Sequence, residues 1–271
     1  MSAEHSNVES RMMKTINLLA IEYCSLSCAY CSTGAPFAKK IHHSAESFCK
    51  YLDLLVAKQI PFDYISITGG EPFLHPEVRD GSFFQLLKDR YPSKKIGVTT
   101  NFSWASVKNI IKYAPIIRML RGMDISMYVQ VVDRLGGQEK FNRLVELLKE
   151  ECPNTHITIY DQSAFCMWEL HNDEHEVKQP CCTSDCFILK PNGELSHCSI
   201  AIGAQNTPEY NAIVKMSRDA ILDLSKIDGR EEFLSWAWKY PFDLCFHCTM
   251  WRAEYMEWQL LLPLQKTLFH L

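Results

Sequence analysis

Short apolar runs alternate with amphipathic helical patterns along most of this chain of 271 residues, and this alternation constrains its fold more than any other feature. Strand-like runs occupy residues 14–23, 63–68, 96–100, 123–128 and 156–160. Helical spacing of apolar residues is clearest at Phe141, Leu144, Val145 and Leu148. Strands that alternate with helices in this way form parallel βα units. Five units, with a sixth left open, predict an α/β fold built as a partial (β/α)5-6 barrel.

The loops after the first two strands carry the residues with the clearest chemical character. In sheets of parallel βα units, functional sites lie beyond the carboxyl ends of the strands. The first loop contains Cys24, Cys28 and Cys31, and the second loop begins with Gly69-Gly70-Glu71-Pro72. We therefore expect both loops at the same end of the sheet.

Three cysteines within eight residues can wrap one small inorganic cluster. They cannot all pair as disulfides, because three is an odd number. A four-iron cluster usually takes four cysteines, so three leave one iron with an open position, as a catalytic metal requires. A zinc knuckle that lacks its fourth ligand is the alternative for Cys24, Cys28 and Cys31.

The C-x3-C-x2-C spacing, with Tyr30 before the last cysteine, resembles the signature of the radical SAM superfamily. The resemblance implies a [4Fe-4S] cluster whose open iron binds S-adenosylmethionine (SAM). One electron from the reduced cluster would split SAM into methionine and a 5′-deoxyadenosyl radical. That radical would take a hydrogen atom from the substrate, while the protein positions the substrate and excludes water.

The glycine loop is the second part of the resemblance. In radical SAM enzymes the matching loop binds the amino group of SAM, and glycines admit a close backbone approach. An ordinary turn, or a solvated strand end, is the alternative at each of these positions. The resemblance implies a set of cofactor-binding residues at the strand ends: Tyr30, Gly69, Gly70, Glu71, Pro72, Thr100, Asn101 and Ser126.

A second set of cysteines begins after residue 180. Asn192-Gly193 between two short apolar runs predicts a β-hairpin. Helical stretches are expected at 219–224, at 230–239 and from Trp251 onward. The cysteines of this part of the chain are Cys181, Cys182, Cys186, Cys198, Cys245 and Cys248.

This second set resembles the twitch domain, the short form of the SPASM domain, which holds one auxiliary four-iron cluster. The resemblance implies Cys181, Cys198, Cys245 and Cys248 as ligands, with Cys182 or Cys186 as alternatives to Cys181. A structural zinc site with the same ligands is the alternative. We expect residues 14–165 to form the barrel and 181–260 to form a small hairpin-and-helix auxiliary domain, so that each chain carries two clusters.

The remaining thiols have simpler explanations. Free cysteines such as Cys49 and Cys152 are usually small buried core residues. Cys166 and Glu169 lie between the expected barrel and the expected auxiliary domain, near the mouth of the barrel. They are therefore the tentative catalytic residues. A surplus thiol could also donate a hydrogen atom to the substrate radical, so an epimerase remains an alternative.

The charge of the chain and its lack of targeting signals limit the cellular compartments and the classes of partner that we expect. The net charge is −4 with no block of like charges, which argues against nucleic acid and gives no basis for an anionic membrane surface. The first fourteen residues are mixed and polar, and no apolar run reaches the roughly 20 residues of a membrane helix. We expect a reducing cytoplasm, in which cysteines serve as ligands or free thiols.

The expected reaction follows from the resemblance. A small polar substrate, a sugar or an aminocyclitol, would be dehydrogenated or epimerised, with flavodoxin or ferredoxin as the external electron donor. The aminocyclitol dehydrogenases resemble this chain in size and in their twitch domain. Two alternatives are modification of a ribosomally made peptide or protein, and a non-enzymatic iron–sulfur or zinc protein.

Overall fold

The computed structural model describes residues 15–29, 31–162, 164–166, 170–174, 176–177, 186–216, 218–237, 239, 241–248 and 255–257. Among these residues, no helix is long and apolar enough to span a bilayer.

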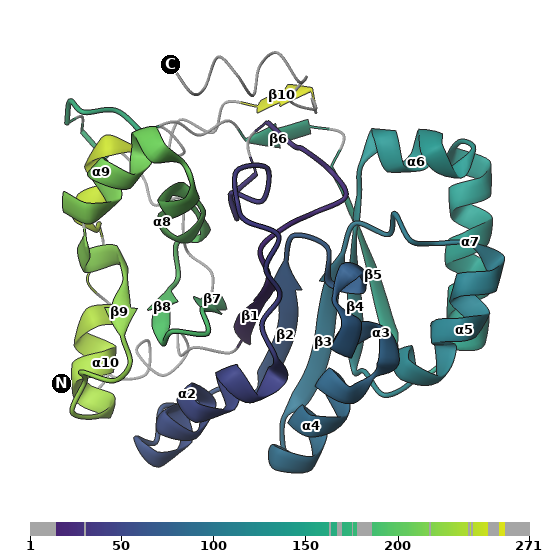
Figure 1. Ribbon diagram of the computed structural model, residues 1–271, viewed down its shortest axis with the longest axis horizontal. Coiled ribbons are helices and arrows are strands. Elements are labelled where there is room, and N and C mark those ends of the chain that lie inside the picture. The colour runs from purple at the N-terminus through teal and green to yellow at the C-terminus, as the bar shows by residue number, and fades with distance from the viewer. Residues whose placement is uncertain are drawn as a thin grey trace, which may run out of the picture.

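Five parallel strands form the main part of one sheet, as the sequence predicts (Figure 1). Each strand pairs with the strand that precedes it in the chain. The strands are β1 (Thr15–Ile21), β2 (Tyr64–Gly69), β3 (Lys95–Thr100), β4 (Gly122–Met127) and β5 (His156–Asp161). Their carboxyl ends therefore lie along one edge, which is the edge that carries the cysteine loop and the glycine loop.

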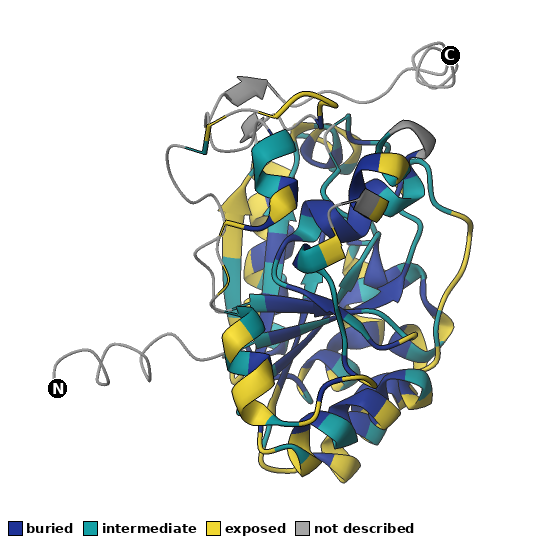
Figure 2. Cartoon of the chain, turned by 90° about the vertical axis from the view of Figure 1, so that its left-hand side faces the viewer, coloured by how far each residue is buried: buried dark blue, intermediate teal, exposed yellow. Residues whose placement is uncertain are grey.

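Helices between the strands cover one face of this sheet. Figure 2 shows the buried residues along the strands and on the helix faces turned toward them, with exposed residues outside. The core there is aromatic and aliphatic, and it includes Phe48, Phe83 and Phe141, all fully buried. The connecting helices are α2 (Ala45–Ala57), η1 (Pro72–Leu74), α3 (Pro76–Asp80), α4 (Ser82–Arg90), α5 (Val107–Ile117), α6 (Val129–Leu135) and α7 (Gln138–Glu151).

Helix α2 takes its N-terminal cap from a distant residue. Ser44 occupies the N-cap position, but its side chain makes no capping hydrogen bond. The carboxylate of Glu77, on α3, accepts instead from the backbone N–H of Ala45 at 3.0 Å. A residue 32 positions away thus caps α2, which sequence patterns of local capping do not detect.

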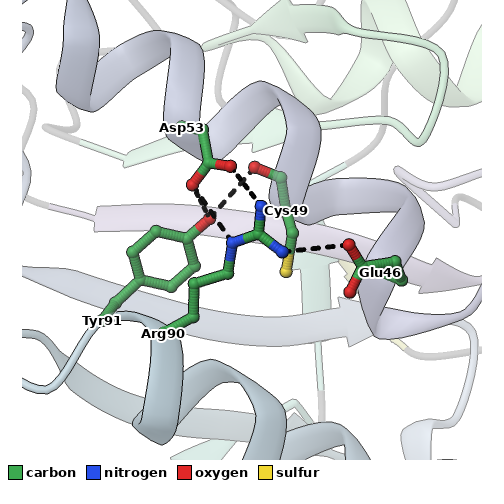
Figure 3. A network of polar contacts seen from close by, with 5 residues as sticks. All are labelled: Glu46, Cys49, Asp53, Arg90 and Tyr91. Atoms are coloured by element: carbon green, nitrogen blue, oxygen red, sulfur yellow. Dashed lines mark hydrogen bonds and ion pairs between the residues drawn. The ribbon is translucent and has the colours of Figure 1, made fainter.

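A polar network joins the outer surfaces of α2 and α4 (Figure 3). The guanidinium of Arg90 bridges the carboxylates of Glu46 and Asp53. The hydroxyl of Tyr91 donates to Asp53 at 2.7 Å and reaches the carbonyl oxygen of Cys49 at 3.0 Å. The network fixes the two helices against each other.

The predicted hairpin is confirmed, and it extends the main sheet. Strand β7 (Cys186–Leu189) pairs antiparallel with β8 (Glu194–Ser196), and β9 (Leu222–Asp223) follows β8. Strand β7 also pairs parallel with β1, so it supplies the sixth parallel strand of the sheet. Gly193 has φ +89°, the left-handed conformation that the tight turn requires. The division into domains 14–165 and 181–260 stays a prediction.

A second apolar core forms beyond the hairpin, around Ile213, Val214 and Phe242. Its elements are α8 (Ser199–Gly203), η2 (Ala204–Asn206), α9 (Pro208–Met216), η3 (Arg218–Ala220), α10 (Arg230–Ala237) and η4 (Asp243–His247). The helix expected over 219–224 is wrong, because η3 ends at Ala220 and β9 follows it. The helix expected from Trp251 is wrong over Tyr255–Glu257, which is strand β10 and pairs with β6 (Ala164–Cys166).

Candidate metal and cofactor site

The glycine loop holds the start of the cysteine loop by backbone contacts. Gly70 donates its N–H to the carbonyl of Ile21 at 2.8 Å, and Glu71 donates its N–H to Tyr23 at 3.1 Å. A Cβ on Gly69 would lie 2.0 Å from the oxygen of Ile21, and one on Gly70 would lie 1.8 Å from that of Tyr23. Both glycines are therefore required by the packing of the two loops against each other.

The three predicted thiols gather around one aromatic side chain. Cys28 is buried together with Leu26 and Val131, while Cys24 and Cys31 are half-buried against the same cluster. Tyr128, at the end of β4, packs there too. Burial raises the pKa of Tyr128 most, and the three thiols, in the order Cys28, Cys31 and Cys24, raise it further.

Hydrogen bonds from neighbouring loops reach two of the sulfurs. The side-chain amide of Asn101 donates to Cys24 Sγ at 3.2 Å, and the N–H of Leu26 reaches the same sulfur at 3.4 Å. Thr33 Oγ1 lies 3.3 Å from Cys31 Sγ and donates to the carbonyl of Gly69. Burial, assisted by the charge of Glu71, raises the pKa of Cys24 to about 12. The Cys24 side chain is therefore a neutral thiol near pH 7, and metal binding would release its proton.

Glu71 is fully buried and cross-links the ends of β2 and β3. Its Oε1 accepts from the N–H of Phe73 at 3.0 Å and from Thr100 Oγ1 at 2.8 Å. Its Oε2 accepts from the N–H of Asn101 at 2.8 Å. Burial raises the pKa of Glu71 to about 7, although all three donors favour the ionised carboxylate.

The other predicted cofactor residues have the following positions. Thr100 is buried and, besides its bond to Glu71, accepts from Trp104 Nε1 at 3.0 Å. Pro72 is buried as the first residue of η1. Ser126 is half-buried and hydrogen bonds to Tyr128 beside the thiols. Tyr30 lies outside the described residues.

The donor set of this site suits an iron–sulfur cluster. Soft thiolate ligands select such clusters, zinc and Cu(I) over hard cations. In the described part of the chain, no three His, Cys, Asp or Glu side chains converge as ligands of a single metal ion. The thiols of Cys24, Cys28 and Cys31, which share one apolar cluster with Tyr128, fit an iron–sulfur cluster by the type of their donor atoms.

Three cysteines of the second set share the second apolar core. Cys198 and Cys248 are buried in it, and Cys245 packs against it. Ser196 Oγ accepts from the N–H of Cys198 at 3.1 Å and donates to the carbonyl of Ala220 at 2.6 Å, which fixes the turn after β8.

Cys245 lies in η4 and Cys248 directly follows it. Residues 170 and 171 pair with this segment. Leu170 bridges to Cys248, and the N–H of His171 donates to the carbonyl of His247 at 2.9 Å. Of the upstream alternatives, Cys186 lies in β7. The outermost pair of the hairpin is Ile188 with Ser196. Cys186 precedes Ile188 by two residues, and Cys198 follows Ser196 by two residues. Cys181 and Cys182 lie outside the described residues.

The tentative catalytic pair is only partly described. Cys166 ends β6, where it pairs with Tyr255, and Glu169 lies outside the described residues.

A contact between the two cysteine sites is absent from the sequence expectations. Gly34, three residues after Cys31, meets the end of α8, where a Cβ would lie 2.3 Å from the carbonyl oxygen of Gly203. A Cβ on Gly203 would in turn lie 2.2 Å from the oxygen of Ser32. Helix α8 starts directly after Cys198, so this contact joins the loop of the first site to the helix of the second. Its one sequence signal is the pair of isolated glycines.

Comparison with known proteins gives a structural likeness only. No protein-family model matches the sequence, and no curated protein sequence matches it. BtrN in complex with AdoMet and 2-DOIA superposes with a TM-score of 0.55 at 13% identity, covering 88% of this chain and 93% of that one.

Two further structures are less similar. BtrN in an open conformation gives a TM-score of 0.43 at 14% identity, covering 80% of this chain and 90% of that one. Native anSMEcpe with bound AdoMet gives a TM-score of 0.38 at 18% identity, covering 54% of this chain and 42% of that one. The predicted α/β fold class is confirmed, and the resemblance to the radical SAM superfamily holds at the level of the fold, which this chain shares with BtrN over nearly its whole length.

Proposed function

We propose that this protein is a radical SAM enzyme that acts on a small polar substrate. The observation that carries the proposal is the gathering of Cys24, Cys28 and Cys31 around Tyr128 at the carboxyl edge of the sheet. The fold shared with BtrN, whose structure was solved with AdoMet bound, supports it.

Cys24, Cys28 and Cys31 would hold a four-iron cluster, which with bound SAM would supply a 5′-deoxyadenosyl radical able to remove a hydrogen atom from an unactivated carbon. The chain itself has supporting tasks. Asn101 holds the sulfur of Cys24 by its side-chain amide, and Glu71 fixes the backbone of Asn101. Leu26 and Val131 pack with Cys28 in one apolar cluster and shield its sulfur from water.

Cys198, Cys245 and Cys248, with one cysteine from Cys181, Cys182 and Cys186, are the proposed ligands of an auxiliary four-iron cluster. Burial of the first three in one core supports this assignment. A cluster with four cysteine ligands has no vacancy, so it suits electron transfer. If a base removed the hydroxyl proton of the substrate radical, this cluster would accept its remaining electron, and the alcohol would become a ketone.

The proposed substrate is a sugar or an aminocyclitol, which is dehydrogenated or epimerised, and the proposed electron donor is a flavodoxin or a ferredoxin. The compartment proposed is the cytoplasm. BtrN was crystallised with 2-DOIA, a small-molecule ligand, which supports a small substrate here. A product isolated from deuterium oxide separates the two reactions. Epimerisation through an exchangeable thiol leaves one solvent deuterium on carbon, and dehydrogenation leaves none.

The test of the central proposal is SAM cleavage by anaerobically reconstituted protein under dithionite. Cys28→Ala abolishes formation of 5′-deoxyadenosine, because one iron loses its ligand. Cys152→Ala is the control, since Cys152 is also buried but lies in the main core, away from the thiols of the site. Undiminished cleavage by Cys28→Ala contradicts the proposal.

An iron count tests the auxiliary site. Two clusters give about eight irons per chain, and one cluster gives about four. Loss of about four irons in a Cys245→Ala/Cys248→Ala double variant, with SAM cleavage retained, assigns the second cluster to this pair. A wild-type count of about four removes it.

A further inference from the structure

From β2 to β5, the face of the sheet opposite the helices is polar. In a strand, alternate residues point to opposite faces. Ile65 and Ile67 of β2 belong to the helix-covered core, so Tyr64 and Ser66 point to the other face. On β4, Met123 and Ile125 belong to that core. Their neighbours Asp124 and Ser126 therefore also point to the polar face, and both are half-buried.

Two glycines make room for an aromatic side chain on this face. Gly97 of β3 and Gly122 of β4 are paired neighbours. A Cβ on Gly97 would lie 1.8 Å from the hydroxyl oxygen of Tyr64, and one on Gly122 would lie 2.7 Å from it. The side chain of Tyr64 thus lies across both glycines, and its hydroxyl has a fixed place over the first residue of β4.

Asp124 lies in the adjoining position of this face. Its partners in register are Thr99 on β3 and Thr158 on β5, and Thr158 hydrogen bonds to its carboxylate. No ion pair to Asp124 occurs among the residues that the structure describes. This half-buried carboxylate therefore has capacity for further hydrogen-bond donors.

Several titratable groups act on this part of the face. Burial raises the pKa of Asp124, and His156 lowers it. Asp124 is the largest cause of the raised pKa of Tyr160. Burial raises the pKa of Tyr64 most, Asp124 raises it further, and Arg121 lowers it.

In the strand register Tyr160 pairs with Ser126, the next residue of this face after Asp124, and the hydroxyl of Tyr64 lies over Gly97 and Gly122. Asp124 therefore lies between the Tyr64 hydroxyl, at Gly122, and Tyr160, at Ser126.

The position along the strand suits a substrate. Tyr128, where the thiols gather, follows Asp124 by four residues, which is about 13 Å of extended chain. This spacing leaves room for the nucleoside of a cofactor and a small ligand between the thiols and the carboxylate. Tyr160 is 49% exposed, so its ring can also pack against the C–H face of a ring-shaped ligand.

We propose that Asp124, flanked by the hydroxyls of Tyr64 and Tyr160, binds O–H or N–H donors on adjacent carbons of a small polyol or amino polyol. The identification of this ligand as the substrate rests on the function proposed above. The binding itself depends on the polar face alone. A carboxylate accepts two such donors at once, and a neutral amide accepts on one atom only.

The test is a saturation-transfer NMR titration of the full chain, purified anaerobically, with two probes. Glucosamine supplies an ammonium group and hydroxyls, and myo-inositol supplies hydroxyls alone. Asp124→Asn is expected to raise the Kd of the bound probe roughly tenfold. Asp89→Asn, on the exposed outer side of α4, is the matched control and leaves the Kd unchanged.

A second variant tests the place of Tyr64. Gly97→Ala must displace the Tyr64 hydroxyl, so it weakens binding, whereas Gly229→Ala is a control because nothing lies within 4 Å of its added Cβ. A wild-type preference for glucosamine that Asp124→Asn removes identifies an amino polyol. Equal binding of both probes identifies a neutral polyol.

Failure of this inference is distinct from failure of the proposed function. If neither probe binds the wild type, or if Asp124→Asn leaves the Kd unchanged, the inference is overturned, whatever the SAM-cleavage assay gives. If Cys28→Ala retains SAM cleavage but Asp124→Asn loses probe binding, the proposed function fails and the polyol site stands.

Discussion

Gly34 and Gly203 meet backbone to backbone, so that a Cβ on the first would lie 2.3 Å from the carbonyl oxygen of the second. Gly34 belongs to the loop of the first cysteine site, and Gly203 ends the helix that starts after Cys198. Neither backbone can give way easily, because Gly34 also donates its N–H to the carbonyl of Cys31 at 3.0 Å. The two sites are therefore tied by a contact that tolerates no side chain.

Gly203→Ala tests this contact. Gly203 has an ordinary helical backbone, with φ −69°, so the expected cost comes from the clash of the new methyl with the Ser32 carbonyl, not from conformational strain. Overpacking of this kind costs about 1–3 kcal/mol in unfolding free energy. Urea unfolding measures it, and Gly229→Ala, with open space around it, provides the reference. Equal stability of the two variants argues against the contact.

The capping of α2 by Glu77 leads to a prediction opposite to the local sequence pattern. Ser44→Ala changes the unfolding free energy by less than about 0.5 kcal/mol, because the serine side chain makes no cap. Glu77→Ala removes the acceptor of the Ala45 N–H and costs about 1 kcal/mol. Glu77→Gln keeps a side-chain oxygen and recovers part of the loss. Denaturant titrations of the three variants decide the order, and a larger loss for Ser44→Ala contradicts it.

The buried carboxylate of Glu71 predicts a pH dependence of stability. Its pKa in the folded chain is about 7, above the ordinary value of 4.5, so between these pH values the native state binds more protons than the unfolded state. Its contribution is fully present below pH 4.5 and is lost as pH rises through 7, a change of roughly 3 kcal/mol. Unfolding curves across this window measure it.

The variant Glu71→Gln removes this titration, so its stability falls less steeply between pH 4.5 and 7 than that of the wild type. Glu139→Gln serves as the control, because Glu139 is an exposed residue of α7. An unchanged slope in Glu71→Gln would mean that the carboxylate ionises normally in the folded protein.

The amide of Asn101 predicts a spectroscopic effect on the proposed first cluster. Hydrogen bonds to cluster sulfurs stabilise the reduced state and raise the potential. Loss of one bond of about 0.5–1.5 kcal/mol in Asn101→Ala shifts the potential downward by about 20–60 mV. A redox titration followed by electron paramagnetic resonance measures the shift. Asn142→Ala, on the exposed side of α7, leaves the potential unchanged.

Much of the fold was predictable because it depends on local periodicity. Alternating apolar segments place β1 to β5 and the helices between them, and Asn192-Gly193 predicts the hairpin. The failures occurred where tertiary contacts compete with local pattern. Residues 222–223 become a strand because β8 offers an unpaired edge, and 255–257 become a strand because β6 does.

The candidate site divides in the same way. The cysteine spacing and the glycine loop identify Cys24, Cys28 and Cys31 as one group, because thiols so close in sequence must lie close in space. The sequence also places polar residues at the strand ends. It does not show that Asn101 turns its amide to Cys24, since 77 residues separate them.

The sequence by itself determined the parallel sheet, the edge that carries the chemistry and the residues of the first thiol group, because strand alternation and short-range spacing fix these without reference to distant contacts. Only the tertiary structure decided which partner each polar group takes. The Glu71 carboxylate joins β2 to β3, Tyr64 lies over Gly97 and Gly122, and Gly34 meets Gly203. Such pairings depend on how strands curve and on which backbones approach within contact distance, and a linear pattern carries no signal of that approach beyond an isolated glycine.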